Sequence, residues 1–103
     1  MKVTVICVGK VKEKFYREAI TEFSKRLSGY CRLEIIEVAD EKTPDSAGEV
    51  QEEQIKRKEA SRILKYIRED AFLFTLEIMG KQYDSVGLSE RLEKLMTMGK
   101  SHI

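Results

Sequence analysis

The sequence predicts an α/β fold in which a parallel sheet is built with crossover helices, in the order βαβαβα. Three apolar segments rich in β-branched or aromatic residues alternate with three segments of helical periodicity. This alternation is typical of parallel sheets with right-handed crossovers. A chain of 103 residues has the size of one domain, so we expect a single α/β domain over residues 1–103.

The first predicted unit is a strand at residues 2–8 followed by a helix at residues 12–28. The strand sequence KVTVICV is almost continuously apolar, as in a strand covered on both faces. Gly9 ends it, and Gly29 is expected at the C′ position after the helix. The apolar side chains of the helix are Phe15, Ala19, Ile20, Phe23 and Leu27.

The second predicted unit is a strand at residues 31–38 and a charged helix at residues 49–68. The strand becomes apolar on both faces only towards its end. Its first part alternates, so one face is partly exposed to water, which suggests a place near the edge of the sheet. Residues 39–48 contain the only proline and form the one long predicted loop. The helix carries a narrow apolar stripe only in its second half.

The third predicted unit begins with the strongest strand signal in the chain, residues 71–79 (AFLFTLEIM), which we expect at the centre of the sheet. Ser85 is expected to cap the next helix, and Gly99 to end it. A helix that leaves a parallel sheet normally leads into another strand. Either the sheet is minimal, with three strands, or a fourth strand begins after Gly99.

The charge distribution is uneven although the net charge is only +1. Residues 1–30 hold seven Lys or Arg and three Glu, whereas residues 31–60 hold five against nine acidic residues. A basic N-terminal third is compatible with contacts to phosphates. No apolar run approaches the roughly 18 residues of a membrane helix, and no secretory leader is evident, so we expect a cytoplasmic protein.

The residues predict no metal site and no common nucleotide-binding or hydrolase motif. Cys7 and Cys31 are not in a metal-binding pattern and are expected to be free, and His102 is the only histidine. Lysine follows glycine at Lys10 and Lys81, at the ends of two predicted strands, where α/β sheets bind ligands. Each lysine could meet a phosphate or carboxylate, but a turn glycine followed by a solvated lysine is the commoner arrangement.

Four segments together resemble one known family. They are MKVTVICVGKVKEKFYREAITEFSKRL at the start, LEIIEVADEK from residue 33, LEIMGK from residue 76 and SVGLSERLEKLMTMG from residue 85. In this order they are similar to the bacterial large-subunit ribosomal RNA methyltransferase H family, which are pseudouridine N3-methyltransferases of the knotted SPOUT superfamily. The resemblance runs across residues 1–103 without a large gap.

The resemblance implies S-adenosylmethionine as the methyl donor, ribosomal RNA as the substrate, and a homodimer. It assigns Leu76 to cofactor binding and identifies no catalytic residue within the chain. Charge asymmetry adds Lys10, Lys12 and Lys14 as candidate contacts to RNA. Family members continue with a further strand, a glycine-rich cofactor loop and the knot, so we expect this chain to be the N-terminal two-thirds of such a domain, truncated and inactive alone.

Two other interpretations stay open. The chain could be a non-catalytic α/β fragment or a module that self-associates through exposed faces. It could also be an unrelated phosphate-binding α/β domain that uses Lys10 and Lys81, although this hypothesis explains nothing about the residues after Gly99.

Overall fold

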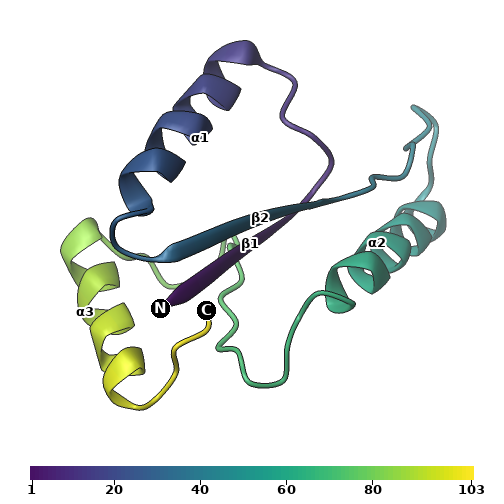
Figure 1. Ribbon diagram of the computed structural model, residues 1–103. Helices are drawn as coiled ribbons and strands as arrows, with labels where there is room; N and C mark the ends of the chain where they lie inside the picture. The colour runs from purple at the N-terminus through teal and green to yellow at the C-terminus, as the bar shows by residue number, and fades with distance from the viewer.

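The computed structural model describes all residues, 1–103, and contains a two-stranded parallel sheet with three helices (Figure 1). Strand β1 (Lys2–Val8) pairs with β2 (Arg32–Val38), with Lys2 opposite Arg32 at one end and Val8 opposite Val38 at the other. The parallel arrangement requires a crossover, which helix α1 provides. The predicted first and second strands and their crossover helix are therefore confirmed.

Helix α1 (Lys14–Leu27) lies against β2 and is strongly amphipathic. Basic residues in its last turn, Lys25 and Arg26, suit the negative end of the helix dipole. Gly29 follows the C-cap residue Ser28, as expected, but its backbone is not left-handed. The helix end thus does not need glycine at this position.

Helix α2 (Glu49–Leu64) packs against both strands and anchors the loop that precedes it. Arg62 donates to the carbonyl oxygen of Ala39 at 2.9 Å and pairs with the carboxylate of Glu41, and the Glu41 amide donates to Glu59 at 3.1 Å. The helix ends four residues before the predicted residue 68. After Leu64 the amides donate to the third preceding residue instead of the fourth, and these tighter turns carry the chain away from the helix axis.

The prediction of a third strand at residues 71–79 is wrong, because this segment forms no helix or strand. The amide of Phe72 donates to the carbonyl oxygen of His102 at 2.8 Å, but the amides of residues 73–79 have no hydrogen-bond acceptor in the protein. High strand propensity is insufficient without a neighbour that offers a row of backbone partners. The expected βαβαβα order is therefore βαβαα, with an extended segment in place of the third strand.

The last three residues provide the short partner beside β1. Lys2 donates to Ser101 at 2.8 Å, Ile103 donates to Lys2 at 2.9 Å, and Lys2 and His102 form a parallel bridge. This pairing lies where the sequence suggested that a fourth strand could begin. The side chains add a contact of 3.0 Å between the Thr4 hydroxyl and Nε2 of His102.

Helix α3 (Ser85–Thr97) has a well-defined cap at each end. Its N-cap is Asp84 rather than the predicted Ser85, and the Asp84 carboxylate accepts from the Gly87 amide at 2.6 Å. At the other end Gly99 adopts a left-handed conformation with φ of 86°, and Lys100 donates back to Leu95 at 2.8 Å. Together with the bond from the Gly99 amide to Met96 at 3.0 Å, this bond forms a Schellman motif, which explains why glycine ends this helix.

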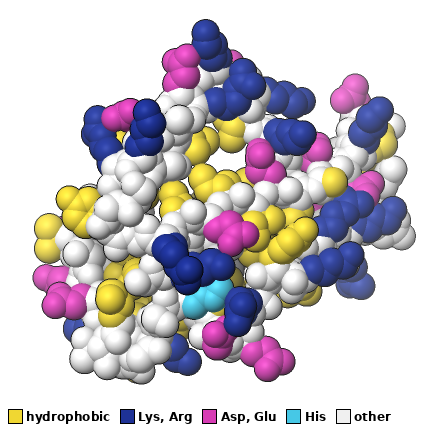
Figure 2. Space-filling model, viewed as in Figure 1, with side chains coloured by type: hydrophobic (Ala, Val, Ile, Leu, Met, Phe, Trp, Pro, Cys, Tyr) yellow, Lys and Arg dark blue, Asp and Glu magenta, His cyan; other side chains and the backbone are white.

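The molecule is open and buries little apolar surface. Only Val38 and Leu95 are buried, and the radius of gyration is 16.1 Å, against about 13 Å for a compact domain of this length. In Figure 1 α1 and α2 lie on opposite sides of the sheet's long axis, and α3 lies beyond the N-terminal end of the strands. Apolar side chains are visible between the charged ones on the face in Figure 2. No helix is both long enough and apolar enough to span a membrane.

Candidate functional site

The predicted lysines lie in and beside the exposed connection from β1 to α1. Lys10, Lys12 and Lys14 are all exposed, and Lys14 pairs with Glu18 at 3.8 Å. Gly9 precedes them with φ of 82°, a left-handed conformation that favours glycine. The three side chains share one short segment, yet no other element of the chain closes over them to form a pocket.

The predicted cofactor residue, Leu76, lies on the extended segment that replaces the third strand. Its side chain is 100% exposed, and the neighbouring Ile78 and Met79 are exposed to a similar extent. A central strand would have been covered on both faces, which is the environment that the sequence predicted. After Leu76 the chain turns, with the Gly80 amide donating to Glu77 at 3.1 Å, and reaches Lys81.

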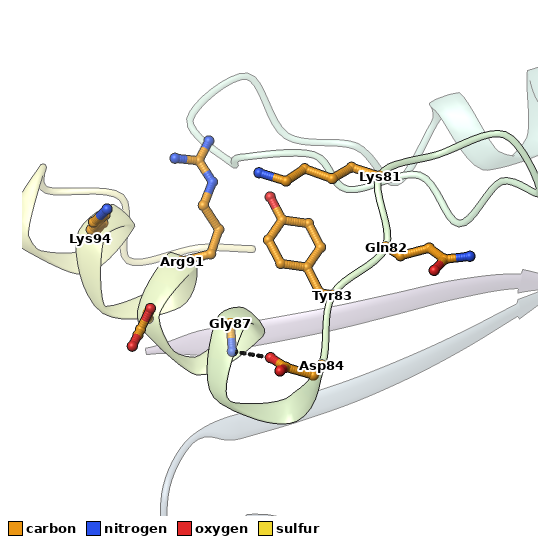
Figure 3. Close-up of a pocket in the computed structure, with 8 residues that line it drawn as sticks. Lys81, Gln82, Tyr83, Asp84, Gly87, Arg91 and Lys94 are labelled. Atoms are coloured by element: carbon orange, nitrogen blue, oxygen red, sulfur yellow. Dashed lines mark hydrogen bonds between the residues drawn. The ribbon is translucent and has the colours of Figure 1, made fainter.

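A shallow hollow of about 820 Å³ lies between the segment at residues 81–84 and the first turns of α3 (Figure 3). Sequence reasoning singled out Lys81 but missed its partners on the helix. Arg91 and Lys94 are three residues apart, which places them on neighbouring positions of one helical face, and this spacing was the available signal. The lining residues are Lys81, Gln82, Tyr83, Asp84, Gly87, Glu90, Arg91 and Lys94.

Aromatic rings, rather than carboxylates, hold two of the cations in this hollow. The ammonium of Lys81 lies 5.1 Å from the centre of the Tyr83 ring, and the guanidinium carbon of Arg91 lies 5.2 Å from the centre of the Phe72 ring. Cation–π contacts orient a charged group without neutralising it. Lys81, Arg91 and Lys94 form no salt bridge within the chain.

Two ionisable groups with shifted pKa values lie outside the hollow. Burial, followed by the nearby negative charge of Glu37, raises the pKa of the Cys7 thiol, so this cysteine is a poor nucleophile near neutral pH. A hydrogen bond from Arg68 lowers the pKa of the exposed Asp70 carboxyl. Neither Cys7 nor Asp70 lines the hollow that contains Lys81, so neither is an acid–base candidate there.

Comparison with known proteins decides the family. The sequence model of the family described as "Predicted SPOUT methyltransferase" matches residues 1–103. The chain belongs to the SPOUT methyltransferase family. This match confirms the resemblance to the SPOUT superfamily that the four sequence segments indicated.

Several SPOUT relatives are similar over the whole chain. "Ribosomal RNA large subunit methyltransferase H" of Bifidobacterium adolescentis is 56% identical over 103 residues. Proteins of the same name from Acetivibrio thermocellus and Ruminiclostridium cellulolyticum are 47% and 48% identical. In each comparison the chain is covered completely and spans 65% of the relative's length.

Membership of the SPOUT methyltransferase family implies the use of S-adenosylmethionine, and the residues present do not enclose such a cofactor. A pocket for a ligand of this size covers most of the ligand's surface with apolar side chains. Leu76 is fully exposed and does not line the hollow beside α3. The chain therefore presents an apolar surface at Leu76 without the opposite wall of a pocket.

Proposed function

We propose that this chain takes part in S-adenosylmethionine-dependent methylation of N3 of a pseudouridine in large-subunit ribosomal RNA. The family match across all 103 residues carries the proposal. Support comes from the relatives, which are named for methylation of the large ribosomal subunit RNA and are 47–56% identical to the chain. Because the proposed substrate is ribosomal RNA, we also expect a cytoplasmic location.

In this proposal Leu76 forms one wall of the cofactor site. An exposed leucine at the end of an extended segment can pack against a flat adenine, and the free backbone amides beside it can donate to the edge of the base. The second wall must come from protein surface that covers Leu76. Homodimerisation, which the family resemblance suggests, is our proposal for how further surface approaches the site.

The basic segment after β1 is the proposed contact to RNA phosphates. Lys10 and Lys12 are exposed and form no salt bridge, and the bond of Lys14 to Glu18 is long and solvated. All three ammonium groups are thus available to an RNA backbone. If reversing the three charges leaves the ribosome affinity and its salt dependence unchanged, this assignment is wrong.

A second candidate function is self-association without catalysis. The exposed apolar side chains of Leu76, Ile78 and Met79 on one segment favour it, because soluble monomers seldom leave such neighbours uncovered. Isothermal titration of the 103-residue polypeptide with S-adenosylmethionine is a one-sided test, because saturable binding favours the methyltransferase candidate and its absence fits both candidates. Micromolar affinity would show that the cofactor surface is complete, whereas the uncovered Leu76 leads us to expect no saturable binding and no methyl transfer by the polypeptide alone.

A chimaera tests the methyltransferase proposal directly. The 103 matching residues of the Bifidobacterium adolescentis relative are replaced by this chain, and transfer of labelled methyl groups to ribosomes is measured. We expect methylation of large-subunit RNA, and its loss with reduced cofactor affinity in Leu76→Asp. Val50→Asp is the matched control, because Val50 is an exposed apolar residue on α2. An inactive but folded chimaera, or equal effects of the two variants, would contradict the proposal.

A further inference from the structure

We propose that the hollow between residues 81–84 and α3 binds a phosphodiester group of single-stranded RNA. This inference rests on the proposed function for the identity of the polymer, and it assigns a site to residues other than the lysines after β1. The hollow is open along one side, with a volume of about 820 Å³, so it can admit a phosphate that belongs to a continuous backbone.

Three hydrogen-bond donors converge above the hollow. In Figure 3 the ammonium of Lys81, the hydroxyl of Tyr83 and the guanidinium of Arg91 point into the same space, whereas Gln82 points away from it. A phosphate has several acceptor oxygens, and the fork of an arginine matches two of them. Lysine and tyrosine then supply donors from the opposite side, so the arrangement suits a tetrahedral anion.

The donors are held in place and are free to bind. Arg91 lies over the Phe72 ring and Lys81 over the Tyr83 ring, and none of the three polar groups has a hydrogen-bond or salt-bridge partner in the chain. By contrast, Arg62 on α2 already donates to a carbonyl and a carboxylate. An anion between Lys81 and Arg91 relieves their mutual repulsion without breaking an existing ion pair.

The charges that line the hollow favour one phosphate rather than a strongly cationic groove. Lys81, Arg91 and Lys94 are opposed by Asp84 and Glu90, and the Asp84 carboxylate is already committed to the Gly87 amide at 2.6 Å. A single phosphodiester balances the remaining positive charge. Lys81 lies five residues after Leu76, so their Cα atoms are at most about 18 Å apart along the chain.

Binding of a short single-stranded RNA to the 103-residue protein tests the inference, with Lys81→Gln and the double variant Lys81→Gln/Arg91→Gln. We expect about tenfold weaker binding for the double variant, and a salt dependence reduced by about 0.7 logarithmic units for one lost phosphate contact. Lys58→Gln/Lys65→Gln on α2 and its C-cap removes the same charge away from the hollow and serves as the control. Because Arg91 is partly buried, the exposed Lys81→Gln alone must show a smaller loss in the same direction.

Nuclear magnetic resonance titrations with the RNA and with inorganic phosphate identify the ligand. We expect RNA to shift the resonances of Lys81, Tyr83 and Arg91 at lower concentration than phosphate does. Equal losses in the hollow and control variants would overturn the inference, as would phosphate binding at these residues without RNA binding. A hollow that binds RNA in a protein whose chimaera lacks methyl transfer would instead support the site and contradict the proposed function.

Discussion

Replacing Leu95 with alanine should remove a large part of the stability of this protein. Leu95 is 1% exposed and is the only side chain that is fully buried. Truncation removes about three methylene equivalents, at about 0.8 kcal/mol each, and leaves a cavity whose cost depends on how far the neighbours relax. The other leucines on the same helix bury less surface, since Leu88 is 41% exposed and Leu92 is only half-buried.

We therefore expect Leu95→Ala to lower the free energy of unfolding by about 2–3 kcal/mol, near the lower end for buried leucines. A domain of this length typically has about 5–15 kcal/mol, and the small core places this protein at the low end of that range. The change should thus remove roughly half of the total. Urea unfolding followed by far-ultraviolet circular dichroism measures it as a shift in midpoint at constant slope.

Met98→Ala is the matched control, because Met98 follows the same helix and is 70% exposed. Its free energy of unfolding should change by less than about 0.5 kcal/mol. If the two variants are equally stable, Leu95 does not occupy a close-packed site, and the reasoning from its burial is refuted.

Further predictions concern the helix ends, a thiol and the extended segment. Asp84→Ala should cost about 1 kcal/mol of unfolding free energy by removing the cap of α3, and Asp84→Asn much less. Gly99→Ala should cost about 1–2 kcal/mol because of its left-handed backbone, whereas Gly29→Ala should be near neutral. Since burial raises the pKa of the Cys7 thiol, the folded state binds more protons above pH 9, so stability should fall as pH rises there, and Cys7→Ala should remove that slope. Amides of residues 73–79 should exchange with solvent quickly, because they have no acceptors.

Patterns within single elements were sufficient to predict most of the fold. The apolar runs at residues 2–8 and 31–38 gave both strands, and helical periodicity gave all three helices. Errors arose where an element depends on another. Residues 71–79 have the composition of a central strand, but their only backbone hydrogen bond to a residue distant in sequence runs from the Phe72 amide to the carbonyl of His102. The predicted cap of α3 was wrong by one residue. Asp84 and Ser85 are both good capping residues, and their order in the sequence does not decide between them.

The candidate sites were less accessible to sequence reasoning because they combine distant residues. The sequence indicated Lys81 because it follows a glycine at the end of a predicted strand. Its proposed role also depends on Tyr83 and on Arg91 of α3, and the Phe72 ring orients Arg91. No local pattern links Phe72 to Arg91, since 19 positions separate them. Leu76 was identified only through the family resemblance, as no property of an isolated leucine indicates a cofactor.

The extended segment has unpaired backbone amides and uncovered apolar side chains in the same place. The amides of residues 73–79 lack acceptors, and the side chains of Leu76, Ile78 and Met79 lack cover. A protein surface that pairs with this segment would supply both, since a neighbouring strand brings backbone acceptors and its own apolar side chains together. Such pairing would also hold Leu76 in place and, through the turn at Gly80, Lys81. Cofactor affinity and RNA affinity should therefore rise together when the segment is covered, because one structural change forms both surfaces.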